Sequence, residues 1–332
     1  MELDPPVQQF LEVNAGELQF LNRLSTCEQR RYMRLLTDLN FLRFSSPGPA
    51  VHSVTDHRVA VPGGEIRCRV YRPSGDTGLP AHLTLHGGAW WQGSIDDLIC
   101  DAISRQRCAE ARLVVVAVDY RLAPEHPYPT GLDDAYDAYH WLVEHAEDLG
   151  VDRSSISIGG NSAGANLAAA LARKVRDAGG PQPILQLLEV PALDLTLATA
   201  REAAAAGGQD MAGELDVAVA RYLSDPGAAR EPLASPMLAD DLNGLPPAVI
   251  FTAEHDPLRT EGERYAARLN AAGVPARATR HLGAMHATAM MTRTWAPAVA
   301  WQRGAAAALR SAHWDDAPVT GMAEADATTA RT

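Results

Sequence analysis

The segment GNSAG, residues 160–164, limits the fold of this chain more than any other feature. It follows a β-type run at 154–159 and precedes a helical run at 166–171. A serine on a tight turn from strand to helix adopts a strained backbone conformation, which glycines two positions to either side accommodate without collision. The turn lifts the hydroxyl of Ser162 clear of the sheet and points the amide of Ala163 toward developing negative charge. The pattern therefore predicts a nucleophile elbow with Ser162 as the nucleophile.

A second segment, HGGAW at residues 86–90, follows an apolar run at 81–85 and therefore lies at the end of an earlier strand. In α/β-hydrolases the loop after the third strand supplies backbone N–H groups to an oxyanion, and glycines let that backbone approach the substrate. The two motifs predict an oxyanion hole built from the N–H groups of Gly88, Ala89 and Ala163. Small residues in a turn can produce either motif by composition alone, but the two together, in this order, favour a catalytic site.

With these motifs the chain resembles the bacterial hormone-sensitive-lipase-like esterases of the α/β-hydrolase fold. Two further segments carry the likeness. The sequence DYRLAPEHPYP at 119–129 resembles the strand-end segment of the family, and DPLR at 256–259 resembles its acid-bearing loop. The likeness runs from about residue 55 to 310. It implies cleavage of carboxylic esters by an α/β-hydrolase domain with a helical cap.

Two residues depart from the family pattern. Ala89 replaces the third glycine of the usual HGGG, which keeps the N–H but adds a methyl group and restricts the backbone to conformations that an L-residue reaches. We expect the oxyanion hole to survive with less room for substrate. Asn161 stands where the family often has aspartate before the serine. We assign Asn161, Trp90 and Trp91 to the substrate pocket, because they flank the nucleophile and the oxyanion loop.

A serine nucleophile requires a base within hydrogen-bond reach, and an acceptor that orients the base. In this fold the chain order is serine, acid, histidine. Asp256 follows the apolar run at 247–253, so it lies in a loop at the carboxyl end of a strand, where sites of open α/β sheets collect. Glu254 is the competing carboxylate. We favour Asp256 because it matches the DPL of the family and lies further into the loop.

Two candidate bases follow a last short strand at 274–280. His286 comes after the flexible residues 283–285 and directly before a predicted helix, which is where the family places its histidine. His281 is expected to end the strand instead. We therefore interpret His286 as the base. We expect His86 to brace the oxyanion loop rather than to take a proton.

The length and the element pattern predict an α/β protein. With 332 residues, 46% hydrophobic and 21% charged, the chain can bury one large core. Amphipathic runs at 133–149 and 262–272 separate apolar runs, which predicts a mostly parallel sheet with helices on both faces. We predict eight strands, at 57–62, 65–72, 80–86, 112–119, 154–159, 183–190, 247–253 and 275–281.

We expect one catalytic α/β-hydrolase domain over residues 51–313. In the family, an N-terminal helical segment, here 1–50, and an insertion after the sixth strand, here about 195–230, form a cap over the active site. The alternative for the N-terminal segment is a helix that merely packs on the sheet. Residues 314–332 are rich in Ala, Asp, Thr and Gly, and we predict a disordered tail there.

The net charge of −12 argues against nucleic acid or an anionic membrane surface as partner, because both attract basic patches. No segment reaches the ~18 consecutive apolar residues of a membrane span, and the first residues lack a basic signal region, so we expect a cytoplasmic protein.

The expected partner is a small-molecule ester, and the sequence leaves open whether the protein forms a homodimer. The motifs imply no metal and no cofactor. The cysteines show no C-x-x-C spacing and are expected to be reduced: Cys27, Cys68, Cys100 and Cys108.

Glu189 lies in the apolar run 184–190, where the family has an apolar side chain. A carboxylate in that position is paired, neutral or facing the cavity. The two interpretations are a strand-end residue bonded to backbone and a residue in contact with substrate.

Taken together, the residues predict two-step acyl transfer on an ester, with Ser162, His286 and Asp256 as the catalytic triad. One rival is a tailoring enzyme of specialised metabolism, in which the same site performs transacylation, lactone opening or elimination. Another is a non-catalytic ligand-binding protein, as in the plant gibberellin receptors, which resemble this family but lack the catalytic histidine. The presence of all three triad residues argues against the second rival.

Overall fold

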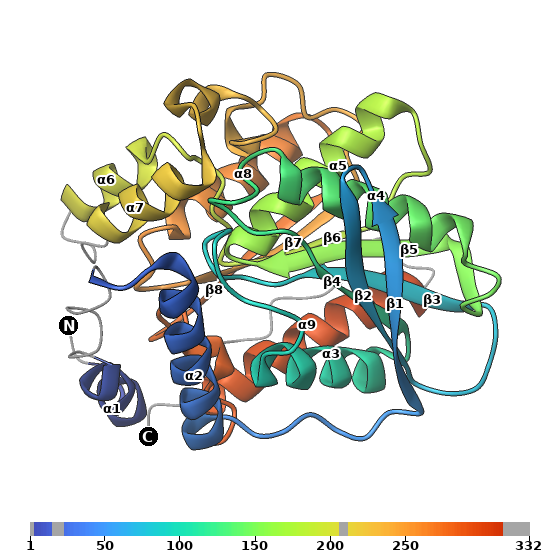
Figure 1. Cartoon of the computed structure of the whole chain (residues 1–332), viewed down its shortest axis with the longest axis horizontal. Helices are drawn as coiled ribbons and strands as arrows, with labels where there is room; N and C mark the ends of the chain where they lie inside the picture. Colours follow the sequence, from blue (N-terminus) through green and yellow to red (C-terminus); the bar gives the residue numbers. More distant parts are fainter. Residues whose placement is uncertain (1–2, 15–22, 206–211, 315–332) are drawn as a thin grey trace.

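The computed structural model describes residues 3–14, 23–205 and 212–314. Within them, eight strands form one sheet in the order β1-β2-β4-β3-β5-β6-β7-β8 (Figure 1). The β1–β2 and β2–β4 pairings are antiparallel and the other five are parallel, as predicted. The strands are β1 Ser53–Val61, β2 Gly64–Arg72, β3 Leu79–Leu85, β4 Val114–Asp119, β5 Val151–Asn161, β6 Gln186–Glu189, β7 Ala248–Ala253 and β8 Ala276–His281.

Strand β4 shows why the strands read as continuous apolar runs. Successive side chains of a strand point to opposite faces of the sheet. Val114, Val116 and Val118 therefore pack into one buried cluster, and Val115 and Ala117 pack into another. Because helices cover both faces, neither set of side chains meets water.

Helices form a layer on each face of the sheet (Figure 1). Helix α3 and helix α9 pack against each other on one face, and α4, α5 and α8 cover the other face. The carboxyl ends of β3, β5, β6 and β7 point toward the same edge, where sites of open α/β sheets form. The bounds are α3 Leu98–Ala111, α4 Thr130–Glu144, α5 Ala163–Ala178, α8 Arg259–Ala271 and α9 Ala296–Trp314.

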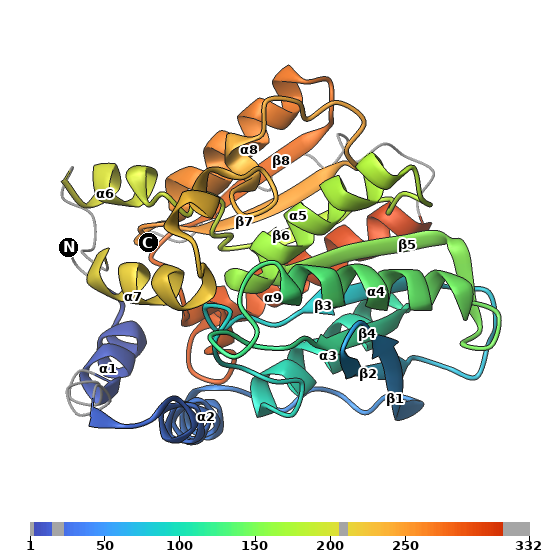
Figure 2. The ribbon, with the colours of Figure 1, turned by 45° about the horizontal axis from the view of Figure 1, so that its top comes forward.

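Four more helices lie beyond this edge of the sheet (Figure 2). Ser25 begins α2 with a capping box, in which its hydroxyl accepts from the N–H of Glu28 while the Glu28 carboxylate accepts from the N–H of Ser25. Arg221 of α7 donates to Gln29 of α2 at 2.6 Å, so the N-terminal segment and the insertion after β6 touch. The helices are α1 Pro5–Asn14, α2 Thr26–Phe44, α6 Ala198–Ala205 and α7 Ala212–Tyr222.

Strand β6 is shorter than predicted at both ends: it begins at Gln186 instead of 183, and at Val190 a φ of +41° turns the chain out of the sheet. Three short 3-10 helices complete the described elements: η2 Pro226–Arg230, η3 Pro236–Leu238 and η4 Thr288–Met290. Helix α9 ends at Trp314, so the predicted tail of 314–332 is wrong at that residue, and its remainder, 315–332, lies outside the described residues. Among the described helices, none has both the length and the apolar character that a bilayer crossing requires.

Candidate active site

The turn between β5 and α5 has the geometry of a nucleophile elbow. Ser162 stands between the two elements with φ +55° and ψ −117°, a conformation that is strained for a residue with a side chain. Its N–H donates to the carbonyl of Glu189 at 2.8 Å, which ties the turn to the end of β6. A Cβ on Gly164 would lie 2.1 Å from the carbonyl oxygen of Leu85. Only glycine therefore fits where the turn passes the end of β3.

The structure brings Ser162, His286 and Asp256 together in one hydrogen-bonded chain. The Oγ of Ser162 lies 2.9 Å from Nε2 of His286, and Nδ1 of His286 lies 2.7 Å from Oδ2 of Asp256. The other carboxylate oxygen of Asp256 accepts from the N–H of Leu258 at 2.9 Å. The Asp256 side chain is completely buried, whereas 27% of the His286 side chain is exposed. The carboxylate of Asp256 is thus held in place by its surroundings, while the ring of His286 remains accessible to solvent.

The electrostatics of the chain favour a basic His286. Burial alone would lower the pKa of His286, but the negative charge of Asp256 and its hydrogen bond outweigh burial and raise that pKa above its usual value. An ionised carboxylate accepts only, so Nδ1 of His286 carries the hydrogen and Nε2 has its lone pair free. The ring can therefore accept the Ser162 proton.

The two competing residues lie elsewhere. The carboxylate of Glu254 accepts from the N–H of Gly283 at 2.7 Å and so fixes the turn that precedes His286. His281 ends β8, and its ring stacks on Trp301 with 4.1 Å between ring centroids. Burial lowers the pKa of His281 to about 4, so its ring is neutral in the folded protein near pH 7. Neither side chain takes part in the hydrogen-bonded chain from Ser162 to Asp256.

The turn after β3 contains three consecutive residues with positive φ: Gly88 at +120°, Ala89 at +52° and Trp90 at +61°. A Cβ on Gly88 would lie 2.1 Å from the carbonyl oxygen of Gln92, so this position requires glycine. Ala89 adopts the left-handed conformation that its methyl group disfavours by about 1 kcal/mol. At +52° Ala89 lies in the small left-handed region that an L-residue can reach, in agreement with the expectation.

Side chains hold this turn from two sides. Asn161 accepts from the N–H of Gly87 at 3.1 Å, which links the nucleophile strand directly to the oxyanion turn. The ring of His86 stacks on Tyr120 at 4.2 Å, and the Tyr120 hydroxyl donates to the carbonyl of His86 at 2.8 Å. The His86 ring also contacts the carbonyl of Gly87 at 2.8 Å. His86 thus braces the turn and is not part of the hydrogen-bonded chain from Ser162 to Asp256.

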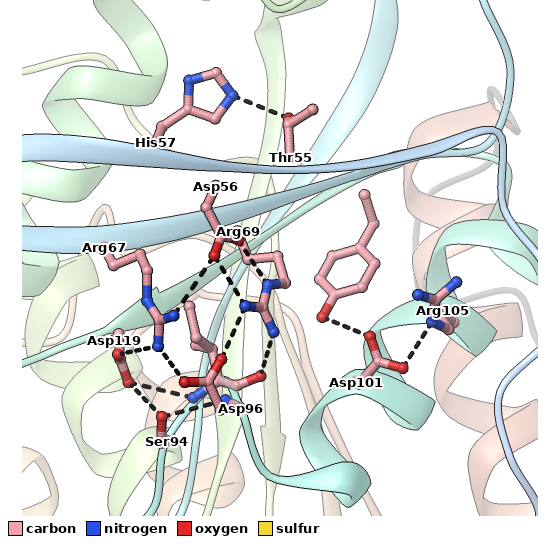
Figure 3. A network of polar contacts seen from close by, with 12 residues as sticks. Thr55, Asp56, His57, Arg67, Arg69, Ser94, Asp96, Asp101, Arg105 and Asp119 are labelled. Carbon is pink, nitrogen blue, oxygen red and sulfur yellow. Dashed lines mark hydrogen bonds and ion pairs between the residues drawn. The ribbon is translucent and has the colours of Figure 1, made fainter.

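An ion-pair network supports the segment that follows the turn (Figure 3). Asp119, at the end of β4, accepts from the hydroxyl of Ser94 at 3.0 Å and from Arg67 at 2.9 Å. Arg67 also donates to Asp96 at 2.6 Å, and Arg69 donates to the same carboxylate at 2.8 Å. The network fixes residues 94–96 against β2 and β4. The sequence indicated Asp119 only as part of a motif, because its partners lie on two other segments, β2 and the loop at 94–95.

A cavity of about 420 Å³ opens onto Ser162 and His286. Trp90 and Asn161 line it, as predicted for the substrate pocket. Trp91, which was also predicted to line the pocket, is not among the described residues that line the cavity. Its ring lies 4.1 Å from the guanidinium of Arg221 instead. Helices α2 and α7 contribute lining residues that the sequence did not single out: Met33, Arg34, Thr37, Glu214, Leu215 and Ala218.

Glu189 also lines the cavity and is paired with other side chains. Arg107 of α3 donates to one oxygen of the buried carboxylate, and Nε1 of Trp301 donates to the other at 2.6 Å. The interpretation of Glu189 as a residue whose side chain bonds to backbone is therefore wrong. Arg107 and Trp301 lie 82 and 112 positions from Glu189, and no sequence pattern links residues so far apart.

Known proteins are similar to this chain in sequence and in fold. Residues 82–290 match a family described by the alpha/beta hydrolase fold. The chain is 41% identical to the carboxylic ester hydrolase LipN of Mycobacterium tuberculosis, over 77% of this chain and 68% of that protein. It is 36% identical to an arylesterase of Saccharolobus solfataricus, over 89% of this chain and 94% of that protein.

A solved structure agrees with these relatives. The hyperthermophilic esterase of Pyrobaculum calidifontis superimposes with a TM-score of 0.86 at 36% identity, covering 94% of this chain and 99% of that one. The matched segment includes the oxyanion turn, the nucleophile elbow, the acid loop and the histidine. The chain therefore belongs to the hormone-sensitive-lipase-like esterases of the α/β-hydrolase fold.

Proposed function

We propose that this protein is a serine hydrolase that cleaves carboxylic esters through an acyl-enzyme, with Ser162, His286 and Asp256 as its triad. The hydrogen-bonded chain from Ser162 to Asp256 at the mouth of a cavity carries the proposal. The names of the relatives add support, since they are called carboxylic ester hydrolase, carboxylesterase and arylesterase.

In the first step, Ser162 Oγ attacks the ester carbonyl as His286 Nε2 takes its proton. The carbonyl oxygen becomes an oxyanion that accepts hydrogen bonds from the N–H groups of Gly88, Ala89 and Ala163. Ala163 is the first residue of α5, so its N–H has no partner within the helix and lies at the positive end of the helix dipole. His286 then gives the proton to the leaving alcohol as the carbon–oxygen bond breaks.

In the second step, water attacks the acyl-enzyme and His286 takes a proton from that water. The resulting tetrahedral species collapses, releases the acid and returns the proton to Ser162 Oγ. Asp256 stays ionised throughout and holds the ring in the orientation in which Nε2 faces Ser162.

The dimensions of the cavity favour small to medium acyl groups. Its volume of about 420 Å³ lies near the low end of ordinary ligand pockets, and it also has to hold the alcohol part of the ester. The Ala89 methyl group and the indole of Trp90 line it near the nucleophile. Helices α2 and α7 supply lining residues from beyond the sheet edge, which supports a role for both segments as a cap.

We also assign the protein to the cytoplasm and its substrates to small-molecule esters. The four cysteines are unpaired, which is typical of a reducing compartment. Separating cell fractions and assaying esterase activity in each checks the assignment. Activity confined to a membrane or secreted fraction would contradict it.

A colorimetric assay with p-nitrophenyl esters of two to sixteen carbons tests the function. The wild-type protein should hydrolyse the short esters best, and Ser162→Ala should lower kcat/KM by at least ~10³-fold while the fold, followed by circular dichroism, is retained. A Ser162→Ala protein with a tenth of wild-type turnover would remove Ser162 as nucleophile. An optimum at twelve carbons or longer would overturn the assignment of a short acyl pocket.

A further inference from the structure

Trp91 directly follows the strained residues of the oxyanion turn, and both α2 and α7 hold it. From α2, Nε of Arg30 donates to the carbonyl of Trp91 at 2.6 Å. From α7, the guanidinium of Arg221 lies over the Trp91 indole, 4.1 Å from the ring centroid. The same arginine donates to Gln29, the neighbour of Arg30. The two segments beyond the sheet edge therefore meet at the residue that ends the turn.

The guanidinium of Arg30 bonds to three residues at once. Besides Trp91, it donates through Nη2 to the carbonyl of Ala123 at 2.5 Å, and through Nη1 and Nη2 to the two oxygens of Glu125 at 2.8 and 2.5 Å. Ala123 in turn donates its N–H to the carbonyl of Trp90 at 3.0 Å. Arg30 thus closes a ring of hydrogen bonds that ties the end of the turn to the segment after β4. The rigid fork of an arginine supplies donors in these directions, whereas a lysine ammonium does not.

The turn next to Trp91 needs such support because it is strained. Ala89 and Trp90 have φ values of +52° and +61°, and the left-handed conformation costs a residue with a side chain about 1 kcal/mol. The N–H groups of Gly88 and Ala89 lie within this turn, so their directions depend on its conformation. Strained backbone persists only where the surrounding structure over-determines it. The contacts at both ends of the turn therefore decide whether the oxyanion hole keeps its shape.

The two ends of the turn are held from different parts of the molecule. The hydrolase core holds the start, where the side chain of Asn161 accepts from the N–H of Gly87 at 3.1 Å. At the far end, the N–H of Trp91 donates to the carbonyl of Gly88 at 3.2 Å, while the carbonyl of Trp91 accepts from Arg30. Part of the hold on the far end thus comes from α2, which lies outside the sheet and its two helical layers (Figure 2).

We propose that Arg30 is a positioning residue, through which α2 must be seated on the core before the oxyanion hole is fully formed. Arg30 does not line the cavity within the described residues. It acts on the N–H groups of Gly88 and Ala89 through the carbonyl of Trp91. The inference rests on the proposed ester hydrolysis and gives α2 a part in the chemical step besides covering the cavity.

The main variant is Arg30→Met, which removes all four hydrogen bonds of the guanidinium. It leaves no buried charge alone, because 51% of the Glu125 side chain is exposed. Arg30→Lys is a milder variant that keeps the cation but loses the fork. Glu125→Gln removes the charge of the ion pair and keeps the bonds of Arg30 to the two carbonyls. Arg31→Met is the matched control, since Arg31 is the next residue of α2 and is exposed.

The kinetic test measures kcat/KM on p-nitrophenyl butyrate and the inhibition constant Ki of 1,1,1-trifluoropentan-2-one. Ser162 adds to the carbonyl carbon of this ketone as its proton passes to His286, so the adduct carries an oxyanion in the hole. We expect Arg30→Met to lower kcat/KM at least ~10-fold and to raise Ki by a similar factor, since loss of a whole oxyanion donor costs about 10²–10³-fold. Arg30→Lys should show part of both effects, and Glu125→Gln and Arg31→Met should show neither. A merely structural role would lower the melting temperature and leave Ki unchanged at temperatures well below it.

Hydrogen exchange of the peptide at 86–95, followed by mass spectrometry, reports on the turn without any substrate. Its amides should exchange at least ~3-fold faster in Arg30→Met than in Arg31→Met, because the bond from Trp91 to Gly88 opens more often. Wild-type Ki or wild-type exchange in a folded Arg30→Met protein would overturn the inference, and so would an equal loss of activity in Arg31→Met. If Arg30→Met does not fold, Arg30→Lys takes its place in the same comparison. If the wild type hydrolyses no ester, the proposed function fails, and the exchange rates then decide separately whether α2 holds the turn.

Discussion

Serine–histidine contacts occur both within β5 and at the turn that follows it, and only the contact at the turn has the features of a catalytic site. At the carboxyl end, Ser162 Oγ lies 2.9 Å from Nε2 of His286. In the buried part of the strand, Ser157 Oγ lies 2.8 Å from Nε2 of His313, which comes from the end of α9. The two distances are the same within the precision that matters for proton transfer. Proximity of a serine to a histidine therefore does not make a nucleophile.

The difference lies in what surrounds each pair. Nδ1 of His286 faces the carboxylate of Asp256, whereas Nδ1 of His313 faces the hydroxyl of Ser155 at 2.8 Å. The carboxylate raises the pKa of His286, while burial without a charged partner lowers the pKa of His313 to about 4. Ser157 is completely buried. A base, an orienting charge and access to substrate thus coincide at one end of β5 only.

The largest expected effect compares the two histidines. His286→Ala should lower kcat/KM on a short ester by at least ~10³-fold, because Ser162 loses its base. His313→Ala should change kcat/KM by less than about threefold but lower the melting temperature, since the hydroxyl of Ser155 loses its bond to His313, whereas that of Ser157 keeps His82 and the carbonyl of Ala81. Steady-state kinetics and thermal unfolding on the same preparations measure both effects.

His281→Ala is a further control, because His281 is the other histidine in the same sequence region. It should keep most of the activity. If His281→Ala is inactive and His286→Ala is active, the assignment of the base is wrong. If His313→Ala loses activity as strongly as His286→Ala, the contrast between the two ends of β5 fails.

The active end of β5 was readable from the sequence because its determinants are local. The glycines of 160–164 and the order of Ser162, Asp256 and His286 predicted the elbow and the triad contacts before any coordinates. The central strands were predicted for the same reason, since β3, β4 and β7 are buried on both faces and form apolar runs, whereas β1 and β8 are partly exposed. Boundaries were less accurate at strand starts: β1 begins at Ser53 instead of 57, β5 at Val151 instead of 154, and β6 at Gln186 instead of 183.

The rest depended on tertiary contacts. The pairing of His313 with β5 joins residues 156 positions apart, and that of Glu189 with Arg107 joins residues 82 apart. The two adjacent tryptophans show a second limit. Trp90 lines the cavity and stacks on Tyr222 at 4.7 Å, whereas Trp91 does not line it within the described residues and contacts Arg221.

A second prediction concerns pH. Attack by Ser162 requires neutral His286, so kcat/KM should fall about tenfold per pH unit below the pKa of His286, which lies above the usual value of about 6.5. The raised pKa also means that protonated His286 favours the folded state. That contribution is fully present below the unfolded pKa of about 6.5 and is lost as the pH rises through the folded pKa.

His313 should act in the opposite sense. Its folded pKa of about 4 lies below the unfolded value of about 6.5, so the unfolded chain binds more protons between these pH values. Its contribution to stability is present above pH ~6.5 and is lost as the pH falls toward about 4. Activity should therefore decline at a higher pH than the one at which this contribution to the fold is lost. Activity profiles and urea titrations from pH 4 to 9 measure the two. His313→Gln should make only the stability profile less steep, with the remaining slope due in part to His281, whose pKa is also about 4. Coincident declines in the wild type would contradict the assignment.

The smallest expected effect concerns backbone strain, a third feature that distinguishes the two ends of β5. Ser162 and Ala89 have φ values of +55° and +52° at the active end, while Ser157 lies in regular strand. Ala89→Gly relieves about 1 kcal/mol of strain but adds a similar cost by freeing the unfolded chain, so stability should change by less than about 1 kcal/mol. The N–H at position 89 is retained, so kcat/KM on p-nitrophenyl butyrate should stay within about threefold. Removal of the methyl group from the cavity wall should raise the ratio of kcat/KM for octanoate to that for butyrate by a few fold, since one methylene of extra room is worth about 1–3 kcal/mol at most.

Gly93→Ala is the opposite test. It adds a methyl group at a φ of +93°, where the new Cβ would lie 2.4 Å from the carbonyl oxygen of Gly87, and it should disturb the turn. If Ala89→Gly lowers activity tenfold or more while Gly93→Ala is tolerated, the strained turn is not what positions the oxyanion hole.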